Sequence, residues 1–219
     1  MEIFGARRGL YFVADLGLLP RARVVDVTRA ALEGGAVMVQ LRAKSLTATQ
    51  MQPPARELVA LCKQFEVPLI VNDLPEVAVA VGAAGAHVGQ EDATVAHARA
   101  LLGEQAIVGA TTPTEQAVRR AEAEGASYVS VGPIFPSPTK PWKPAAGPEL
   151  ARRLRAVTDL PLCVIGGITA DNVHELAGCG VDLVCVISAI AKADDPRAAT
   201  EQLIAAMRAA EVVCGNHPA

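Results

Sequence analysis

Short apolar segments alternate with amphipathic segments along most of the chain. Eight short runs rich in branched aliphatic residues predict β-strands. These runs are Leu10–Ala14, Met38–Leu41, Leu69–Val71, Ala86–Val88, Ala106–Gly109, Tyr128–Val131, Leu162–Ile165 and Leu183–Ile187. Between them, apolar residues recur every three or four positions, most clearly over 55–63 and 115–123, which predicts helices. Glycine or proline precedes most of the runs and marks where each new strand begins.

This alternation of strands and helices predicts a fold class. A strand followed by a helix and then another strand favours parallel pairing. Eight such units in 219 residues predict one α/β domain over residues 1–219, a single (β/α)₈ TIM barrel with its core at about 10–209. The alternative is a doubly wound open sheet, which more often has about five or six strands.

Composition and charge indicate which kinds of partner and location to expect. Hydrophobic residues make up 51% and charged residues 20%, which favours a large core over disorder. The formal net charge is −3 and no basic stripe is present, so we expect no nucleic-acid partner. No apolar run approaches the roughly 18 residues of a membrane span, and no secretory signal is recognisable. Five cysteines without Cys-x-x-Cys spacing are typical of reduced, buried thiols in a cytoplasmic protein.

Polar residues gather where the second predicted strand ends. Gln40 and Arg42 alternate with Leu41, so we expect the first two, together with Lys44, to face the barrel mouth and Leu41 to face the helices. Active sites of such barrels lie at the carboxyl ends of the strands. Two cations and an amide there favour a phosphate or diphosphate ligand. The alternative is a solvated charge cluster at the start of a loop.

Two carboxylates follow the next two strands. The third strand ends in Asn72 and Asp73, and Asp92 follows the fourth. Neighbouring strands bring these carboxylates together beside the cations, and Mg²⁺ prefers one or two carboxylates together with phosphate oxygens and water. We therefore predict a Mg²⁺ site at Asp73 and Asp92. The alternative is that one of them caps the following helix.

Further segments point to a second anion site. Paired glycines follow the seventh strand in Ile165–Ile168, and barrels often bind phosphate with the loops after strands seven and eight. A long proline-rich segment, 132–147, follows the sixth strand, so we expect it at the catalytic face of the barrel. His87, within a predicted strand, is expected to be a hydrogen-bonded core histidine. The chain lacks a Gly-x-Gly-x-x-Gly fingerprint, which disfavours a dinucleotide cofactor.

Together these motifs resemble those of the thiamin phosphate synthase (thiamine-phosphate pyrophosphorylase) family, from about Leu10 to about Ala209. The segments that carry the resemblance are 40–44 (QLRAK), 72–73 (ND), 89–92 (GQED), 131–140 (VGPIFPSPTK), 165–168 (IGGI) and 186–190 (VISAI). The resemblance implies a Mg²⁺-dependent transferase of thiamine biosynthesis. It would condense 4-amino-2-methyl-5-hydroxymethylpyrimidine diphosphate with 4-methyl-5-(2-phosphoethyl)thiazole to give thiamin phosphate and diphosphate.

The resemblance also assigns roles to individual residues. Those implied to bind the pyrimidine diphosphate are Gln40, Arg42, Lys44, Asn72, Thr111 and Lys140. Those implied to bind the thiazole phosphate are Ser137, Thr139, Gly167, Ile187 and Ser188. Asp73 and Asp92 would hold Mg²⁺. Arg42, Lys44 and Lys140 would act catalytically by stabilising the departing diphosphate.

The sequence departs from the family pattern at a few positions and leaves alternatives open. Leu74, Pro113 and Pro141-Trp142 stand where the family often has polar or charged residues, and Thr111 stands where it often has serine. One alternative is the related thiazole tautomerase branch, an isomerase that relies on a histidine. Another is a non-catalytic barrel that binds a phosphate metabolite. The partners expected are small-molecule substrates, and a homo-oligomer is compatible with the sequence.

Overall fold

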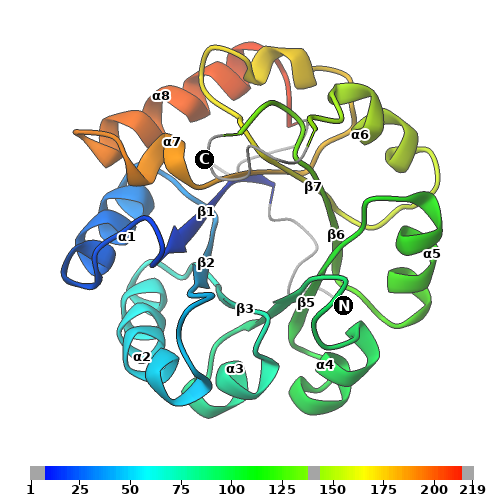
Figure 1. Ribbon diagram of the computed structural model, residues 1–219. Coiled ribbons are helices and arrows are strands. Elements are labelled where there is room, and N and C mark those ends of the chain that lie inside the picture. Colours follow the sequence, from blue (N-terminus) through cyan, green and yellow to red (C-terminus); the bar gives the residue numbers. More distant parts are fainter. Residues whose placement is uncertain (1–7, 138–143, 214–219) are drawn as a thin grey trace.

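Eight parallel strands close into a barrel in the computed structural model, which describes residues 8–137 and 144–213 (Figure 1). Each strand pairs with the next along the chain, and β8 pairs with β1. The strands are β1 (Gly9–Asp15), β2 (Met38–Arg42), β3 (Leu69–Asn72), β4 (Gly85–Val88), β5 (Ile107–Thr111), β6 (Tyr128–Val131), β7 (Leu162–Ile165) and β8 (Leu183–Val186). The predicted TIM barrel is confirmed.

Helices surround the barrel on the outside (Figure 1). They are α1 (Val24–Glu33), α2 (Ala48–Gln64), α3 (Pro75–Val81), α4 (Val95–Leu102), α5 (Glu115–Ala123), α6 (Pro148–Arg155), α7 (Ser188–Ala191) and α8 (Pro196–Ala209), with short 3₁₀ helices η1 (Arg21–Arg23) and η2 (Val173–Leu176). The connection from β7 to β8, all of it described, carries only η2. Both predicted helical patterns lie within helices, and 115–123 coincides with α5.

Local chemistry fixes where several helices begin. The hydroxyl oxygen of Thr94 accepts a hydrogen bond from the His97 amide at the start of α4, and Thr114 does the same for α5. The carboxylate of Asp195 caps α8. Such caps satisfy amide groups that the first helical turn leaves without partners. Thr94 and Thr114 thereby fix the residues at which the loops after β4 and β5 end.

The core has two layers, separated by the strands. Seven of the nine buried residues that fill the inside of the barrel are Tyr11, Met38, Ile70, Ile107, Tyr128, Cys163 and Leu183. The outer layer lies between strands and helices and contains Leu41. Gln40 is buried on the inner side, where its amide donates to Tyr11. The predicted alternation along the second strand is therefore confirmed.

Several strands extend beyond the apolar runs that predicted them, whereas β8 ends one residue earlier, at Val186. The fifth strand was predicted at 106–109 but covers Ile107–Thr111, and β2 and β3 each extend one residue further, to Arg42 and Asn72. The added residues are polar, yet their backbones stay in the ladder, where Thr111 pairs with Ser130. A search for apolar runs stops too early because these strand ends face the mouth of the barrel rather than its core.

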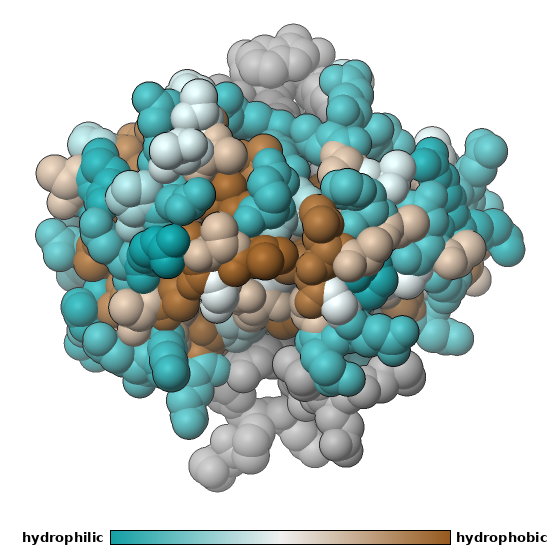
Figure 2. All heavy atoms as spheres, turned by 90° about the horizontal axis from the view of Figure 1, so that it is seen from below, coloured by the Kyte–Doolittle hydropathy of each residue, from teal (hydrophilic) through white to brown (hydrophobic). Residues whose placement is uncertain are grey.

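One side of the ring of helices carries an apolar patch. Figure 2 shows hydrophobic residues near the middle of the face that lies lowest in Figure 1, where α2, α3 and α4 run. Among the described residues, the large hydrophobic side chains left exposed are Val79 on α3 and Leu101 on α4, at 53% and 45%. In the described part of the chain, no helix combines the length and apolar character needed to cross a bilayer.

Candidate active site

A cavity of about 400 Å³ opens at the carboxyl ends of the strands. Nine of the predicted site residues line it, namely Gln40, Arg42, Lys44, Asn72, Asp73, Asp92, Thr111, Ser137 and Ile187. Gly167 and Ser188 lie directly beside lining residues, Gly166 and Ile187 respectively. Thr139 and Lys140 lie outside the described residues. The structure therefore brings side chains from both halves of the chain to one mouth.

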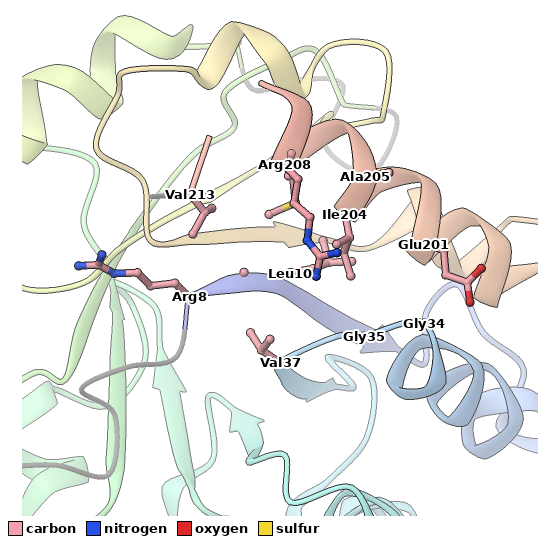
Figure 3. Close-up of a pocket in the computed structure, with 12 residues that line it drawn as sticks. Arg8, Leu10, Gly34, Gly35, Val37, Glu201, Ile204, Ala205, Arg208 and Val213 are labelled. Atoms are coloured by element: carbon pink, nitrogen blue, oxygen red, sulfur yellow. The ribbon is translucent and has the colours of Figure 1, made fainter. Parts of the chain in front are cut away.

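A second cavity, of about 380 Å³, lies at the opposite end of the barrel, between the start of β1, the turn before β2 and α8 (Figure 3). In Figure 3 the Arg8 side chain extends away from Leu10. Arg8 pairs with Asp182, and Glu201 pairs with Arg197. Because barrel chemistry is built on the βα loops at the other end, we place the active site in the first cavity.

Arg42 is held in place by a carboxylate at the end of β1. Its Nη1 lies 2.5 Å from Oδ2 of Asp15, and these two residues pair directly across the strands. The other carboxylate oxygen of Asp15 accepts the Gly17 amide at 2.8 Å. The Asp15 side chain is 2% exposed and that of Arg42 21%. A buried carboxylate thus fixes the orientation of a partly exposed guanidinium at the mouth.

Lys44 sits between the two predicted metal-binding carboxylates. Its ammonium pairs with Oδ2 of Asp73 and lies 3.7 Å from Oδ1 of Asp92. The two carboxyl groups also lie close enough to affect each other's ionisation. Burial and this contact raise the pKa of Asp73, although Lys44 opposes them. Burial acts to raise the pKa of Asp92 too, but the contact with Asp73, the charge of Lys44 and the Gly89 amide outweigh it and lower that pKa.

Neither carboxylate caps a helix. The residue before α3 is Leu74, and the cap of α4 is Thr94. Asp92 instead accepts the Gly89 amide within its own loop, at 3.0 Å. Asp73 has a φ of 67°, in the left-handed region that residues other than glycine seldom occupy. A strained backbone persists only where the surrounding structure holds it in place, and such residues are concentrated at functional sites.

The floor of the cavity is a buried group of polar side chains. Tyr11 and Tyr128 place their hydroxyl oxygens 3.1 Å apart. His87 lies 2.9 Å from the Tyr128 hydroxyl through Nδ1 and 3.0 Å from that of Thr111 through Nε2. His87 is therefore a hydrogen-bonded histidine of the barrel interior, as predicted, and it also lines the cavity. Burial raises the pKa of both tyrosines well above the ordinary value, so both keep their hydrogens.

Comparison with known proteins decides the family. The family model described as thiamine monophosphate synthase matches residues 10–190. The chain belongs to this family. The thiamine-phosphate synthase of Halorhodospira halophila is 42% identical over 198 residues, which are 90% of this chain and 93% of that protein. That of Marinobacter nauticus is 42% identical over 185 residues, or 84% of this chain and 83% of that protein.

A solved structure of the same family has the same fold. The thiamine phosphate pyrophosphorylase from Pyrococcus furiosus superimposes with a TM-score of 0.83 at 33% sequence identity. The match covers 93% of this chain and 97% of that one. The resemblance drawn from the motifs is therefore confirmed. For a thiamine monophosphate synthase family member, the cavity at the carboxyl ends of the strands is the place to look for substrates.

The donor set at Asp73 and Asp92 fits Mg²⁺. Two carboxyl groups at neighbouring strand ends lie close together, and both pair with the ammonium of Lys44. Mg²⁺ uses one or two carboxylates and takes its other ligands from water and substrate phosphates. No group of three or more histidine, cysteine or acidic side chains that could hold a metal occurs among the described residues. This sparse donor set suits an ion that arrives together with a diphosphate.

Gly167 lies in the turn that follows β7, where it packs against a neighbouring segment. Its φ is 66°, and an added Cβ would lie 2.3 Å from the Pro136 carbonyl oxygen and 2.8 Å from that of Phe135. Glycine is thus required because segment 132–137 packs closely on this turn. The Gly167 carbonyl oxygen accepts a hydrogen bond from the side-chain Nδ2 of Asn172 at 2.8 Å. This turn therefore holds the segment that carries Ser137.

Four further residues belong to this site. Tyr11 and Tyr128 were predicted only as parts of strands, Asp15 follows the predicted first strand and was not singled out, and His87 was predicted as a core histidine without its partners. Each faces the inside of the barrel, where alternation along a strand places every second residue. A polar residue at an inward position of a barrel strand is the signal that could have found them.

The cysteines take no part in the chemistry we consider. Cys62, Cys163, Cys179 and Cys185 are buried free thiols, as predicted for those four, and Cys214 lies outside the described residues. Burial raises the pKa of Cys62 to about 12. Cys185 lines the cavity, but burial raises its pKa well above the ordinary value, so it stays a neutral thiol. A neutral thiol is a poor nucleophile.

Proposed function

We propose that this chain is a thiamine-phosphate synthase that joins 4-amino-2-methyl-5-hydroxymethylpyrimidine diphosphate to 4-methyl-5-(2-phosphoethyl)thiazole with the help of Mg²⁺. The observation that carries the proposal is the convergence of Arg42, Lys44, Asp73 and Asp92 on one cavity in a chain of this family. Two cations and two carboxylates form a site for a diphosphate and its metal ion. The chemistry needs no strong nucleophile, and none of the described lining residues is an activated one.

The proposed reaction breaks one bond and forms another. The C–O bond between the pyrimidine methylene and the diphosphate breaks, and its electron pair leaves with the diphosphate. The thiazole nitrogen then donates its lone pair to the methylene carbon, forming the C–N bond of thiamin phosphate. Arg42 and Lys44 stabilise the charge that develops on the leaving oxygen, and Lys140 is proposed to join them. Bound Mg²⁺ would supply further charge stabilisation from Asp73 and Asp92.

The orientation of the cations before substrate binds is central to this proposal. Asp15 fixes Arg42 at the mouth, and the carboxylate pair holds Lys44. Preorganised charges cost no rearrangement when the bond breaks, so they favour the transition state over the ground state. Ser137, together with the turns around Gly167 and Ser188, is proposed to hold the thiazole phosphate on the other side of the mouth. The segment after β6 is proposed to exclude water.

The tautomerase alternative is less well supported. Such an isomerase relies on a histidine to move a proton and needs no diphosphate site. Here both ring nitrogens of His87 lie within hydrogen-bond distance of Tyr128 and Thr111. The carboxylate pair and Lys44 would serve no purpose in isomerisation.

One assay separates these functions. Purified protein is mixed with both substrates, with Mg²⁺ or with EDTA, and thiamin phosphate and diphosphate are quantified by chromatography. We expect equal amounts of the two products, formed only when Mg²⁺ is present. Lys44→Ala should reduce the rate, whereas Lys63→Ala, on the outer surface at the end of α2, should not. Isomerised thiazole without diphosphate release, or binding without turnover, would contradict the proposal.

We propose two further properties, a cytoplasmic location and a homo-oligomeric state. Buried, free cysteines support a cytoplasmic location, since oxidising compartments favour disulfides. The exposed Val79 and Leu101 on neighbouring helices are compatible with a homo-oligomer. Sedimentation of the purified protein would give its oligomeric state directly.

A further inference from the structure

Two cations at the mouth of the cavity are held in different ways. Arg42 pairs with the buried carboxylate of Asp15, and its side chain is 21% exposed. The Lys44 side chain is 52% exposed, although its ammonium pairs with Asp73 and lies 3.7 Å from Oδ1 of Asp92. A lysine carries its charge on a flexible four-carbon stem, with three donors that can take new partners. Lys44 is therefore the cation that can change partners without leaving a buried charge behind.

The carboxylates that hold Lys44 are themselves fixed by the backbone. The Asp73 amide donates to the His87 carbonyl oxygen at 2.8 Å, and Asp73 keeps its φ of 67°. Oδ2 of Asp92 accepts the Gly89 amide at 3.0 Å, and an added Cβ at Gly89 would lie 2.4 Å from that oxygen. The side chains of Asp73 and Asp92 are 15% and 25% exposed. The negative charges therefore stay in place, while the ammonium can move.

Two carboxylates this close need a positive charge beside them. A like charge nearby disfavours the ionised form of a carboxyl group, and an opposite charge favours it. Among the described residues, Lys44 is the one cation that pairs with either Asp73 or Asp92. Lys44 therefore supplies, in the substrate-free protein, the positive charge that a metal ion would supply later.

The ammonium and a divalent ion would compete for these carboxylates. Mg²⁺ binds carboxylate oxygens directly, and an ion pair with an ammonium uses the lone pairs of the same oxygens. Two cations a few ångströms apart near a protein surface also repel each other. Both effects weaken metal binding while Lys44 stays on the carboxylates. A diphosphate relieves the competition, because its oxygens accept the ammonium and leave the carboxylates to the metal ion.

We propose that Lys44 is an exchangeable counter-ion, which pairs with Asp73 and Asp92 in the free protein and moves to the diphosphate when the metal ion binds. This inference rests on the proposed function for the identity of the anion and of the metal ion. The carboxylate pair keeps Lys44 at the mouth until the substrate arrives. The metal ion and the diphosphate then each raise the affinity for the other by the same factor.

The first test measures metal binding without diphosphate. Mn²⁺, which prefers the same oxygen ligands as Mg²⁺, is titrated into the protein, and free Mn²⁺ is counted by electron paramagnetic resonance. Lys44→Met removes the charge and keeps a side chain of similar length. Because a competing charge is lost, Lys44→Met should bind Mn²⁺ about 10-fold or more tightly than the wild type does. An unchanged or weaker affinity, or no binding by this variant, would overturn the inference.

Two matched variants separate competition from a general effect of charge. Arg42→Met removes a cation of the same cavity that pairs with Asp15 instead, and Lys63→Met removes one at the end of α2. The folding of every variant is checked by circular dichroism. Neither control should tighten Mn²⁺ binding to the extent that Lys44→Met does. An equal gain in Arg42→Met would attribute the effect to the net charge of the cavity and refute the specific role of Lys44.

The second test locates the ammonium directly. Crystal structures are determined without ligands and with Mg²⁺ and inorganic diphosphate. We expect Nζ of Lys44 on the carboxylates in the first structure and on a diphosphate oxygen in the second. An ammonium away from the carboxylates in the free protein, or still paired with both beside a bound metal ion, would contradict the exchange. Absence of wild-type turnover would refute the proposed function and leave the Mn²⁺ comparison standing.

Discussion

Replacing Asp15 with asparagine tests how the site holds Arg42. The substitution keeps the shape of the side chain, and its oxygen can still accept the Gly17 amide, as Oδ1 of Asp15 does at 2.8 Å. It removes the charge that faces the Arg42 guanidinium. Since Asp15 is 2% exposed, water cannot take its place at that position. Arg42 is then expected to leave its position at the mouth or to stay there without a counter-charge.

The structure sets the expected magnitudes. Removing one partner from a fully buried ion pair costs about 3–5 kcal/mol. Because 21% of the Arg42 side chain is exposed, solvation offsets part of that loss, and we expect about 2–3 kcal/mol of destabilisation. Loss of one preorganised charge-stabilising group costs about 10²-fold or more in rate, so kcat/KM should fall by about that factor.

The assay pairs urea denaturation with steady-state turnover. Glu57→Gln makes the same chemical change in the exposed pair between Arg21 and Glu57, whose side chains are 45% and 48% exposed. An exposed pair contributes about 1 kcal/mol or less, so this control should keep wild-type turnover and nearly wild-type stability. If Asp15→Asn retained the wild-type kcat/KM, the argument that a buried carboxylate orients Arg42 would be refuted.

Three further substitutions or treatments test other parts of the structure. Asp92→Ala should abolish most turnover at low Mg²⁺ while circular dichroism stays unchanged, and a wild-type rate there would exclude Asp92 as a metal ligand. Gly167→Ala should lower the free energy of unfolding more than Gly82→Ala does. Both glycines have φ near 67°, but only at Gly167 do backbone atoms lie within 3 Å of the new Cβ. Equal decreases in the free energy of unfolding, measured in urea, would contradict the packing argument. Burial raises the pKa of Cys62 to about 12, so Cys62 stays a neutral thiol at pH 8. Iodoacetamide should therefore not alkylate Cys62 until the protein is denatured, which peptide mass spectrometry would show.

The sequence predicted the fold well because its pattern is set by burial. Each strand of the barrel is covered on both faces, so each appears as a short apolar run, and the helices between them keep an apolar stripe. The alternation of Gln40, Leu41 and Arg42 also gave the correct facing of that strand. What failed were strand ends such as Thr111, where polar residues continue the ladder.

The site could be predicted only in part. Residues in loops at strand ends, such as Lys44 and Asp92, stand out because charge follows an apolar run. Tyr11 and Tyr128 do not stand out, since aromatic residues are common in strands and their partners are far away in sequence. The close packing of Gly167 against Pro136 is a contact between two loops, and no local pattern records it.

Closure of the barrel sets when the site can first exist during synthesis. The first strand pairs with the last, Gly9 with Leu183 and Phe12 with Val186. The barrel therefore cannot close until the last strand has been synthesised. The cavity takes Tyr11 from the first strand and Cys185 from the last. A ribosome-bound chain shorter than about 190 residues should therefore not bind the substrates. Ligand capture by arrested nascent chains of increasing length would report the moment at which the last strand is inserted.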